Sequence, residues 1–236
     1  MIDIHTHIVP YVDDGSKTTE DSLRMLEDEI REGVTDVICT PHFRRGMFEK
    51  SLKETELEFN VFKKEVVKRG LNINIYLGQE IFIHHMSSFN RYFDNDYIRP
   101  LNNTNVYLLE FDYFDDIDVT EVAYNVHLQK KKVIIAHIER YTYLTIDDAR
   151  ELKNIGAYIQ VNASSVLGKH GLRVKSKVTK LLKEGLVDFV ASDIHSSRTN
   201  YLAKAYDKVE KKYGKEYAKA IFEDNARELL LNEGMK

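Results

Sequence analysis

His5 and His7, near the start of the chain, have the residue type and spacing needed to bind a divalent metal ion. They belong to a run in which apolar and polar residues alternate, which predicts a short, buried strand. Side chains two residues apart on a strand point to the same side, so both imidazoles would face one point in space. The acidic pair Asp13-Asp14 lies in a turn-forming segment just beyond. Imidazoles with carboxylates close behind them suit a divalent metal, although two surface histidines would explain the pair alone equally well.

The same kinds of side chain recur farther along the chain, each where a predicted strand ends. Apolar runs predict strands at residues 34–40, 73–79, 105–109, 133–136 and 187–192. The carboxyl ends of parallel strands meet at one face of a barrel, which is where such folds carry their chemistry. One polar residue at a strand end would be ordinary, whereas the whole set at one face indicates a metal site. The candidate ligands are His5, His7, Asp14, His42, Glu80, Glu110, His137, Asp193 and His195.

The donor set narrows the choice of metal. It contains imidazole and carboxylate but no thiolate, and many carboxylates favour ions with high coordination numbers. Manganese is therefore the first expectation, with iron, zinc or magnesium as alternatives. This many ligands exceed the needs of one ion, so we predict two or three ions, bridged by a carboxylate such as Glu80.

Several arginines stand beside the candidate ligands. Arg140 lies three residues after His137. Arg44 and Arg45 follow His42, and Arg198 follows His195. A guanidinium beside a metal cluster suits a phosphoryl substrate, because its planar fork binds two oxygens while the metals bind others. Loop solvation would explain Arg44 and Arg45 equally well, and the alternative for Arg140 is an ion pair with a neighbouring carboxylate. The candidate catalytic residues are Arg140, Asp193, His195 and Arg44.

Composition limits the remaining classes of function. The chain has 236 residues, of which 43% are hydrophobic, and we predict a single domain, residues 1–236. Thirty-four Lys and Arg against 38 Asp and Glu leave a net charge of −4, without a basic block that would favour nucleic acid. We find no signal peptide and no apolar run long enough for direct membrane insertion. The single cysteine, Cys39, excludes an intrachain disulfide and is typical of a cytoplasmic protein. The oligomeric state is left open.

A repeated order of elements must position the ligands: an amphipathic helix, a glycine, and then a short apolar strand. The first predicted helix can be capped by Thr18 or Thr19 and ends at Gly33. Gly70, Gly156 and Gly185 occupy the equivalent place in later units. Alternating strands and helices imply parallel pairing, and roughly seven such units favour a closed or nearly closed barrel. An open doubly wound sheet is the alternative, but no glycine-rich phosphate loop follows the first strand.

Several short motifs of the chain resemble those of the PHP (polymerase and histidinol phosphatase) family. They are Asp-Ile-His-Thr-His, Val-Asp-Asp-Gly, Thr-Pro-His, Gly-Gln-Glu, Leu-Leu-Glu-Phe, Ala-His-Ile-Glu-Arg-Tyr and Ser-Asp-Ile-His. Their order and spacing match from Met1 to about Leu231. The likeness is closer to a bacterial branch of manganese-dependent protein-tyrosine phosphatases from capsule and exopolysaccharide operons.

This resemblance implies an α/β fold, a distorted (β/α)7 TIM-like barrel, with a trinuclear metal site. By analogy, one ion is held by His5, His7, Glu80 and Asp193, a second by Glu80, Glu110 and His137, and the third by Asp14, His42 and His195. The resemblance also implies a substrate, the phosphotyrosine-rich tail of a partner bacterial tyrosine kinase that controls polysaccharide export. The chain departs from the family pattern in two places: Ser196 stands where Asn is common, and Arg198 comes earlier than expected.

Four other interpretations compete with this one. Cys39 and Arg45 have the spacing of a cysteine-dependent phosphatase, but the thiol lies in an apolar strand and Pro41 removes an amide that such a loop needs.

The alternative function on the same scaffold is a histidinol-phosphate or other small-molecule phosphatase. An amidohydrolase would commonly bridge its metals through a modified lysine, where this chain has Glu110. A scaffold that binds metal for stability would not need so many ligands. We therefore expect phosphomonoester hydrolysis by a metal-bound hydroxide, without a covalent phosphoenzyme.

Overall fold

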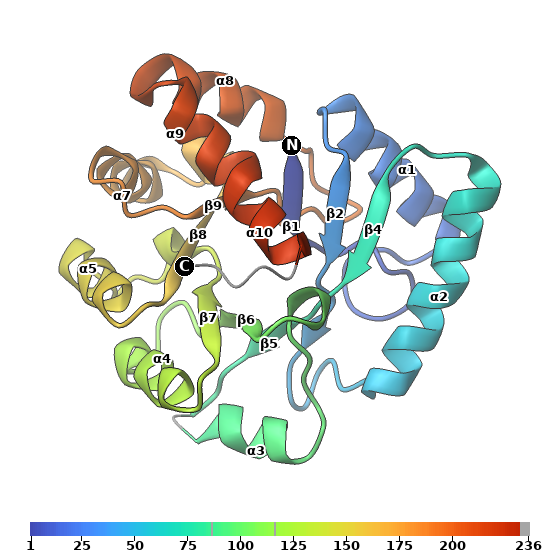
Figure 1. Cartoon of the computed structure of the whole chain (residues 1–236), viewed down its shortest axis with the longest axis horizontal. Helices are drawn as coiled ribbons and strands as arrows, with labels where there is room; N and C mark the ends of the chain where they lie inside the picture. Colours follow the sequence, from blue (N-terminus) through green and yellow to red (C-terminus); the bar gives the residue numbers. More distant parts are fainter. Residues whose placement is uncertain (86, 116, 232–236) are drawn as a thin grey trace.

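The computed structural model describes residues 1–85, 87–115 and 117–231, and positions 232–236 of the predicted domain lie outside it. Parallel strands curl around a common axis and helices surround them (Figure 1). The strands are β1 (Ile2–Thr6), β2 (Asp36–Cys39), β3 (His42–Phe43), β4 (Asn74–Leu77), β5 (Glu80–Phe82), β6 (Val106–Glu110), β7 (Lys132–Ile135), β8 (Tyr158–Asn162) and β9 (Phe189–Ala191). They pair in the orders β1-β2-β4 and β3-β5-β6-β7-β8-β9.

Two of the barrel's strands are bent into halves. β2 continues into β3 and β4 into β5, while β2 pairs with β4 and β3 pairs with β5. The nine strands of the described residues therefore occupy seven positions around the barrel. The gap beside β1 is bridged after β9, where Asp193 N donates to His5 O and His7 N donates to Ile194 O, both at 3.0 Å. The structure confirms the predicted distorted (β/α)7 barrel.

Helices cover the outside of the strands (Figure 1). A large apolar cluster between the two layers includes Leu26 of the first helix and Phe62 of the second, both fully buried. No helix of the described residues has both the length and the apolar character needed to cross a bilayer. The helices are α1 (Thr19–Arg31), α2 (Leu52–Arg69), α3 (Ser88–Asp94), α4 (Val119–Leu128), α5 (Ile146–Asn154), α6 (Ala163–Val166), α7 (Leu172–Lys183), α8 (Leu202–Tyr213), α9 (Lys215–Lys219) and α10 (Asn225–Leu231).

The inside of the barrel is filled by a second apolar cluster. It contains side chains from the strands, such as Ile4 and Leu108, together with Ala226 and Leu229 of α10. Asn102, just before β6, also donates from its side chain to the carbonyl of Leu230. α10 therefore covers the end of the barrel at which the strands begin, and Figure 1 shows it crossing in front of β1. The opposite end, where the strands finish, is left for a functional site.

The helix ends follow the sequence predictions. Thr18 caps α1 by accepting a hydrogen bond from the backbone N–H of Asp21. The glycines predicted to end helices all have positive φ angles, in the region that only glycine enters at little cost: Gly33 (83°), Gly70 (71°), Gly156 (85°) and Gly185 (66°).

Four predicted strands end one or two residues earlier in the structure, as β2, β4, β7 and β9. Thr40 and Ser192 lie just beyond β2 and β9, where side chains replace strand partners: the Thr40 hydroxyl accepts from Thr6 N, and Ser192 N donates to the Asp3 carboxylate. The apolar pattern cannot show where a side chain takes the place of a strand as hydrogen-bond partner, because the partners are distant in sequence. α3 was not predicted, since its segment is rich in aromatic residues without a clear helical period.

Candidate metal centre

All of the predicted ligands lie at the open end of the barrel. His5 belongs to β1, Glu110 ends β6, and His42 and Glu80 begin the bent-over halves β3 and β5. The remaining ligands lie in the loops that follow β1, β7 and β9: His7, Asp14, His137, Asp193 and His195. The structure brings these side chains into four overlapping groups, in each of which the potential ligand atoms lie within 4.8 Å of one another.

The loop after β1 returns to this site because residue 15 is glycine. Ser16 N donates to the carbonyl oxygen of His7 at 3.1 Å. A Cβ atom on Gly15 would lie 2.1 Å from that same oxygen, closer than any side chain could approach. This tight turn holds the carboxylates of Asp13 and Asp14 beside the histidines of β1.

His137 and Asp193 have left-handed backbones, with φ of 31° and 53°. Non-glycine residues adopt this conformation at a cost, so the surroundings must hold them there. The backbone N–H of His137 donates to Gln160 Oε1 at 2.7 Å, and the side-chain amide of Asn162 donates to Asp193 Oδ2 at 2.8 Å. The end of β8 thus positions ligands that follow its two neighbouring strands.

Glu80 lies at the centre of the cluster and is fully buried. Its Oε2 atom is 3.1 Å from His5 Nε2, 3.2 Å from His7 Nε2 and 3.0 Å from His42 Nδ1. Its Oε1 atom is 3.0 Å from His137 Nε2. A carboxylate that faces four imidazoles with both oxygens has the geometry required to bridge two metal ions.

Two further carboxylates flank Glu80. Asp193 Oδ1 lies 3.8 Å from His5 Nε2 and 3.5 Å from His7 Nε2. Glu110 Oε1 lies 3.7 Å from His137 Nε2. These separations exceed hydrogen-bond length but allow an ion between each carboxylate and its imidazoles.

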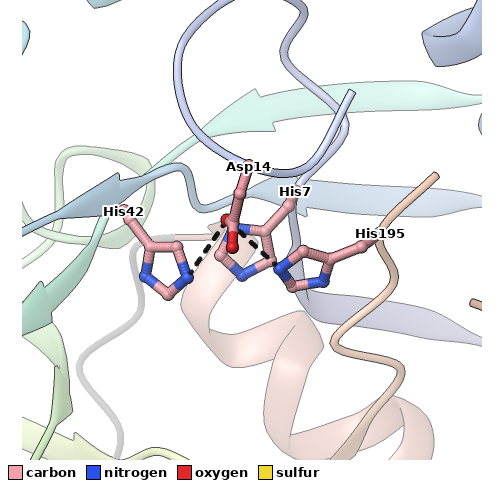
Figure 2. Close-up of side chains that lie close together, drawn as sticks. All are labelled: His7, Asp14, His42 and His195. Atoms are coloured by element: carbon pink, nitrogen blue, oxygen red, sulfur yellow. Dashed lines mark ion pairs between the residues drawn. The ribbon is translucent and has the colours of Figure 1, made fainter. Parts of the chain in front are cut away.

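The third group is nearest to solvent. Figure 2 shows the imidazoles of His7, His42 and His195 gathered around the carboxylate of Asp14. Asp14 Oδ1 is 3.7 Å from His42 Nε2 and 3.5 Å from His195 Nε2. The four groups overlap the three sets implied by the family resemblance without coinciding with them. His7 joins Asp14, His42 and His195, and His42 rather than His137 is grouped with Glu80 and Glu110.

Hydrogen bonds on the far side of the imidazoles determine which nitrogen faces the centre. His5 Nδ1 lies 3.2 Å from Gln160 Oε1, and His7 Nδ1 lies 2.7 Å from Asp13 Oδ2. His195 Nδ1 lies 3.1 Å from the carbonyl oxygen two residues before it. These oxygens only accept, so each Nδ1 carries the proton and each Nε2 presents a lone pair to the cluster. Such outer partners are characteristic of metal-binding histidines.

Several buried atoms at the centre have no hydrogen-bond partner. They include Glu80 Oε2 and His42 Nδ1. In addition, His5 Nε2 and His7 Nε2 face each other at 3.3 Å, although both are lone-pair atoms in the tautomers just described. A buried cation between them would satisfy these atoms, so the residues present fit divalent metal ions.

The electrostatics also require positive charge at the centre. Burial opposes ionisation of Glu80, but the charges of His5 and His42 and a bond from His137 hold its pKa well below the usual range. Burial likewise disfavours imidazolium at His5, yet Glu80 and Asp193 raise its pKa above normal. Cations must therefore balance this concentration of carboxylates, and metal ions would serve instead of protons.

Three arginines border the cluster. Arg140 Nη1 lies 3.5 Å from Asp193 Oδ2, and its guanidinium carbon is 4.4 Å from the centre of the Tyr113 ring. Arg198 binds the same aspartate more closely, at 3.0 Å to Oδ2 and 3.0 Å to its carbonyl. Arg44 instead stacks on Phe82 at 4.0 Å, at the edge of the site. The long contact of Arg140 leaves most of its guanidinium available for a substrate. Arg198 is instead bound to Asp193, although it lies earlier in the sequence than the family pattern predicts.

These groups enclose a hollow of about 240 Å³. Ligands line its floor, and the three arginines, Met47, Phe48 and Tyr113 form its walls. Phe48 packs in parallel against the imidazole of His42, with ring centres 5.5 Å apart. Charged groups below and apolar or aromatic groups beside them suit a phosphoryl group attached to an aromatic ring.

The rival nucleophile is not part of this hollow. Cys39 is completely buried in the apolar core, and burial raises the pKa of its thiol to about 12. It therefore has neither the exposure nor the ionisation that a cysteine-dependent phosphatase needs.

Some outer-layer residues were missed from the sequence. The sequence predicts only a turn at Asp13, and no role in the site for Gln160 or Asn162. Tyr113, which donates to Glu110 Oε1 at 3.3 Å, was not singled out. A signal was present for Gln160 and Asn162: they are polar residues two apart at the carboxyl end of β8, like the ligands themselves.

Comparison with known proteins connects this site to a family. The family model for capsular polysaccharide synthesis proteins, CpsB/CapC, matches residues 1–231. The tyrosine-protein phosphatase CpsB of Streptococcus agalactiae is 38% identical over an alignment that covers 98% of this chain and 99% of the relative. The tyrosine-protein phosphatase YwqE of Bacillus subtilis is 30% identical, and the alignment covers 99% of this chain and 92% of YwqE.

A solved structure matches the fold over nearly its whole length. It comes from the crystal structures of YwqE from Bacillus subtilis and CpsB from Streptococcus pneumoniae, described as unique metal-dependent tyrosine phosphatases. The match has a TM-score of 0.90 at 29% identity and covers 98% of this chain and 95% of the other.

Proposed function

The chain belongs to the CpsB/CapC family of capsular polysaccharide synthesis proteins, and from this premise we propose that it is a metal-dependent protein-tyrosine phosphatase. The observation that carries the proposal is the cluster of imidazoles and carboxylates beneath a hollow whose walls hold three arginines. The relatives are named tyrosine-protein phosphatases, and this does not favour the histidinol-phosphate alternative.

The ligand roles proposed here follow the geometry of the cluster. Glu80 would bridge ions, with His5, His7 and Asp193 on one side and Glu110 and His137 on the other; Asp14, His42 and His195 would hold a further ion. When bound, divalent ions lower the pKa of coordinated water and neutralise phosphoryl oxygens. We propose manganese first, with iron, zinc or magnesium as alternatives, because the donors are imidazole and carboxylate.

The residues of the chain itself would orient the phosphoryl group. Arg140 is placed to donate paired hydrogen bonds to its outer oxygens, and charge-assisted bonds of this kind strengthen as charge develops on the leaving oxygen. Arg198 would act through Asp193, which it holds by two contacts. Asp193 and His195 were assigned both ligand and catalytic roles, and in this arrangement the catalytic role is to position the ions.

The walls of the hollow support an aromatic substrate. Met47 is 60% exposed and lies in the wall of the hollow. Together with Phe48 it offers the apolar surface that a tyrosyl ring would cover. We propose that the physiological substrate is a phosphotyrosyl segment, such as the tail of a bacterial tyrosine kinase, and that the reaction regulates capsular polysaccharide synthesis.

The proposal is tested by comparing substrates before and after metal removal. Purified protein should release phosphate from a phosphotyrosyl peptide much faster than from histidinol phosphate. Activity should disappear with a strong chelator and return with manganese. Faster turnover of histidinol phosphate, or full activity without metal, would overturn the assignment.

A further inference from the structure

A second hollow, of about 390 Å³, adjoins the metal site and shares Arg140 with it. Its wall contains three more cations, Arg173, Lys177 and Lys180, all from α7. Among the described residues, Glu139 is the carboxylate that lines this wall, and its Oε1 accepts a hydrogen bond from the backbone N–H of Asn162 at 3.0 Å. The lining thus holds four cationic side chains against one carboxylate. The hollow is therefore strongly cationic in a chain whose net charge is −4.

The three cations that α7 contributes to this hollow are bound to carbonyl oxygens or exposed, and are not paired with carboxylates. Arg173 donates to the carbonyl of Thr142 at 2.6 Å, and Lys177 Nζ donates to the carbonyls of Ile138 and Tyr141, both at 2.9 Å. Within residues 1–85, 87–115 and 117–231, none of Arg173, Lys177 or Lys180 forms an ion pair. These bonds fix the loop that carries Arg140 against α7, and they leave the positive charges unneutralised.

The sequence of α7 accounts for this charge. Its residues Leu172–Lys183 include five basic side chains and no acidic one. Arg173 and Lys180 are exposed, so the hollow opens to solvent on this side. Like charges one turn apart on a helix repel each other, and the described structure places no carboxylate in an ion pair with Arg173, Lys177 or Lys180 to offset this repulsion.

A different hollow borders the metal site through Arg44, and its charge is opposite. This one measures about 710 Å³, and its wall contains Asp112, Asp115, Asp118 and Glu121. The basic character of the α7 hollow is therefore specific to one side of the site rather than general to its surroundings.

We propose that the α7 hollow binds an anionic side chain of the substrate peptide, a carboxylate or a second phosphate, close in sequence to the scissile phosphotyrosine. This inference rests on the proposed phosphatase function. Because both hollows share Arg140, and an extended peptide advances about 3.4 Å per residue, the anionic group lies within about three positions of the phosphotyrosine. Arg173 and Lys180 bind it, and Lys177 adds its charge from the inner wall.

The test compares three peptides that differ at one flanking position: glutamine, glutamate, or a non-hydrolysable phosphonate analogue of phosphotyrosine. The ratio of kcat/KM between a charged and the neutral peptide is measured within each protein variant, so that differences in metal content cancel. The unsubstituted protein should prefer a charged flank by about three- to tenfold. A larger preference for the phosphonate than for glutamate would identify a second phosphate as the natural occupant.

The matched variants are Arg173→Gln with Lys180→Gln, and Lys175→Gln with Lys183→Gln. Both pairs remove the same charge from α7, but Lys175 and Lys183 are exposed outside the lining of the hollow. The preference should fall to about onefold in the first variant and persist in the second. No preference in the unsubstituted protein, or equal loss in both variants, would overturn the inference.

A second measurement separates this inference from the proposed function. Peptides in which the scissile phosphotyrosine is also replaced by its phosphonate report affinity without turnover. If the protein hydrolysed none of the peptides, the phosphatase proposal would fail, and affinities would decide the inference alone. Tighter binding of the charged-flank analogue, lost in the Arg173→Gln, Lys180→Gln variant, would still support it, and equal affinities would refute it.

Discussion

The floor and the rim of the metal site differ in burial. The floor consists of His5, His7, Glu80 and His137, none of which is more than 2% exposed, whereas Asp14 at the rim is 56% exposed and Arg198 is 45% exposed. Floor residues are held by the barrel and by each other, so altering one disturbs the whole cluster. Rim residues can be replaced while the barrel stays intact, because few other groups depend on them.

The largest difference should appear between the floor carboxylate Glu80 and the rim carboxylate Asp14. Replacing Glu80 by Gln keeps its size but removes the charge that faces four imidazoles, so we expect nearly complete loss of bound metal and of activity. Asp14→Asn should lose at most the outermost ion. Metal per chain, measured by mass spectrometry, and melting temperature check this expectation. Equal metal content in the two variants would argue that Glu80 does not bridge.

Replacing Arg140, at the rim, should lower the rate of catalysis while leaving the bound metal in place. Arg140→Ala is expected to lower kcat by about 100- to 1000-fold, since it removes a donor to the developing charge. Metal content and melting temperature should change little, because its contact with Asp193 is 3.5 Å. Arg140→Lys should recover only part of the rate, as a point charge cannot replace the fork.

Arg198→Ala is the control for Arg140. Arg198 binds Asp193 at 3.0 Å, so its loss should reduce metal affinity together with activity. If Arg140→Ala lost metal in the same way, Arg140 would be a structural partner of Asp193, and its catalytic assignment would be withdrawn.

Asp13 tests whether the floor depends on its outer layer. Asp13→Asn removes the negative charge beside His7 Nδ1, where the carboxylate lies at 2.7 Å, and weakens the preference for the tautomer that directs Nε2 inward. Outer partners of this kind typically contribute about 10- to 100-fold in metal affinity. Titration of metal-free protein with manganese measures the change. An unchanged affinity would show that His7 is oriented by the strand alone.

Cys39 should show the smallest effect of all. The thiol is buried away from the hollow, so Cys39→Ser should retain most activity and remain fully sensitive to a chelator. A modest loss of stability is expected from placing a hydroxyl in an apolar core. Loss of phosphatase activity at unchanged metal content would reinstate the cysteine mechanism.

The sequence predicted the floor better than its supports. Ligands at strand ends are visible because each one follows an apolar run, and the parallel barrel then brings them together whatever the details of the loops. The outer partners could not be found in the same way. The bond between His5 and Gln160 joins residues 155 positions apart, and it depends on β9, which pairs with β8 and whose following segment is bonded to β1.

The hollows were also beyond prediction from sequence. The basic character of α7 can be read from its residues, but a charged helix is usually only solvated. The basic residues of α7 line a hollow only because the loop that carries Arg140 packs against this helix, where Lys177 binds two of its carbonyls. Similarly, the early position of Arg198 put its role in doubt, and only the turn after β9 shows that it still reaches Asp193.

The closure of the barrel beside β1 has a consequence for the order of assembly. His5 and His7 come near the start of the chain, but their loop is joined to Asp193 and Ile194 by backbone hydrogen bonds. A growing chain would therefore carry five of the nine candidate ligands by Glu80, long before Asp193 and His195 existed, and the barrel cannot close until the last strand arrives. The metal centre is thus complete only when the chain has folded through β9. A chain truncated before β9 would lack Asp193 and His195, and with them the geometry for hydrolysis.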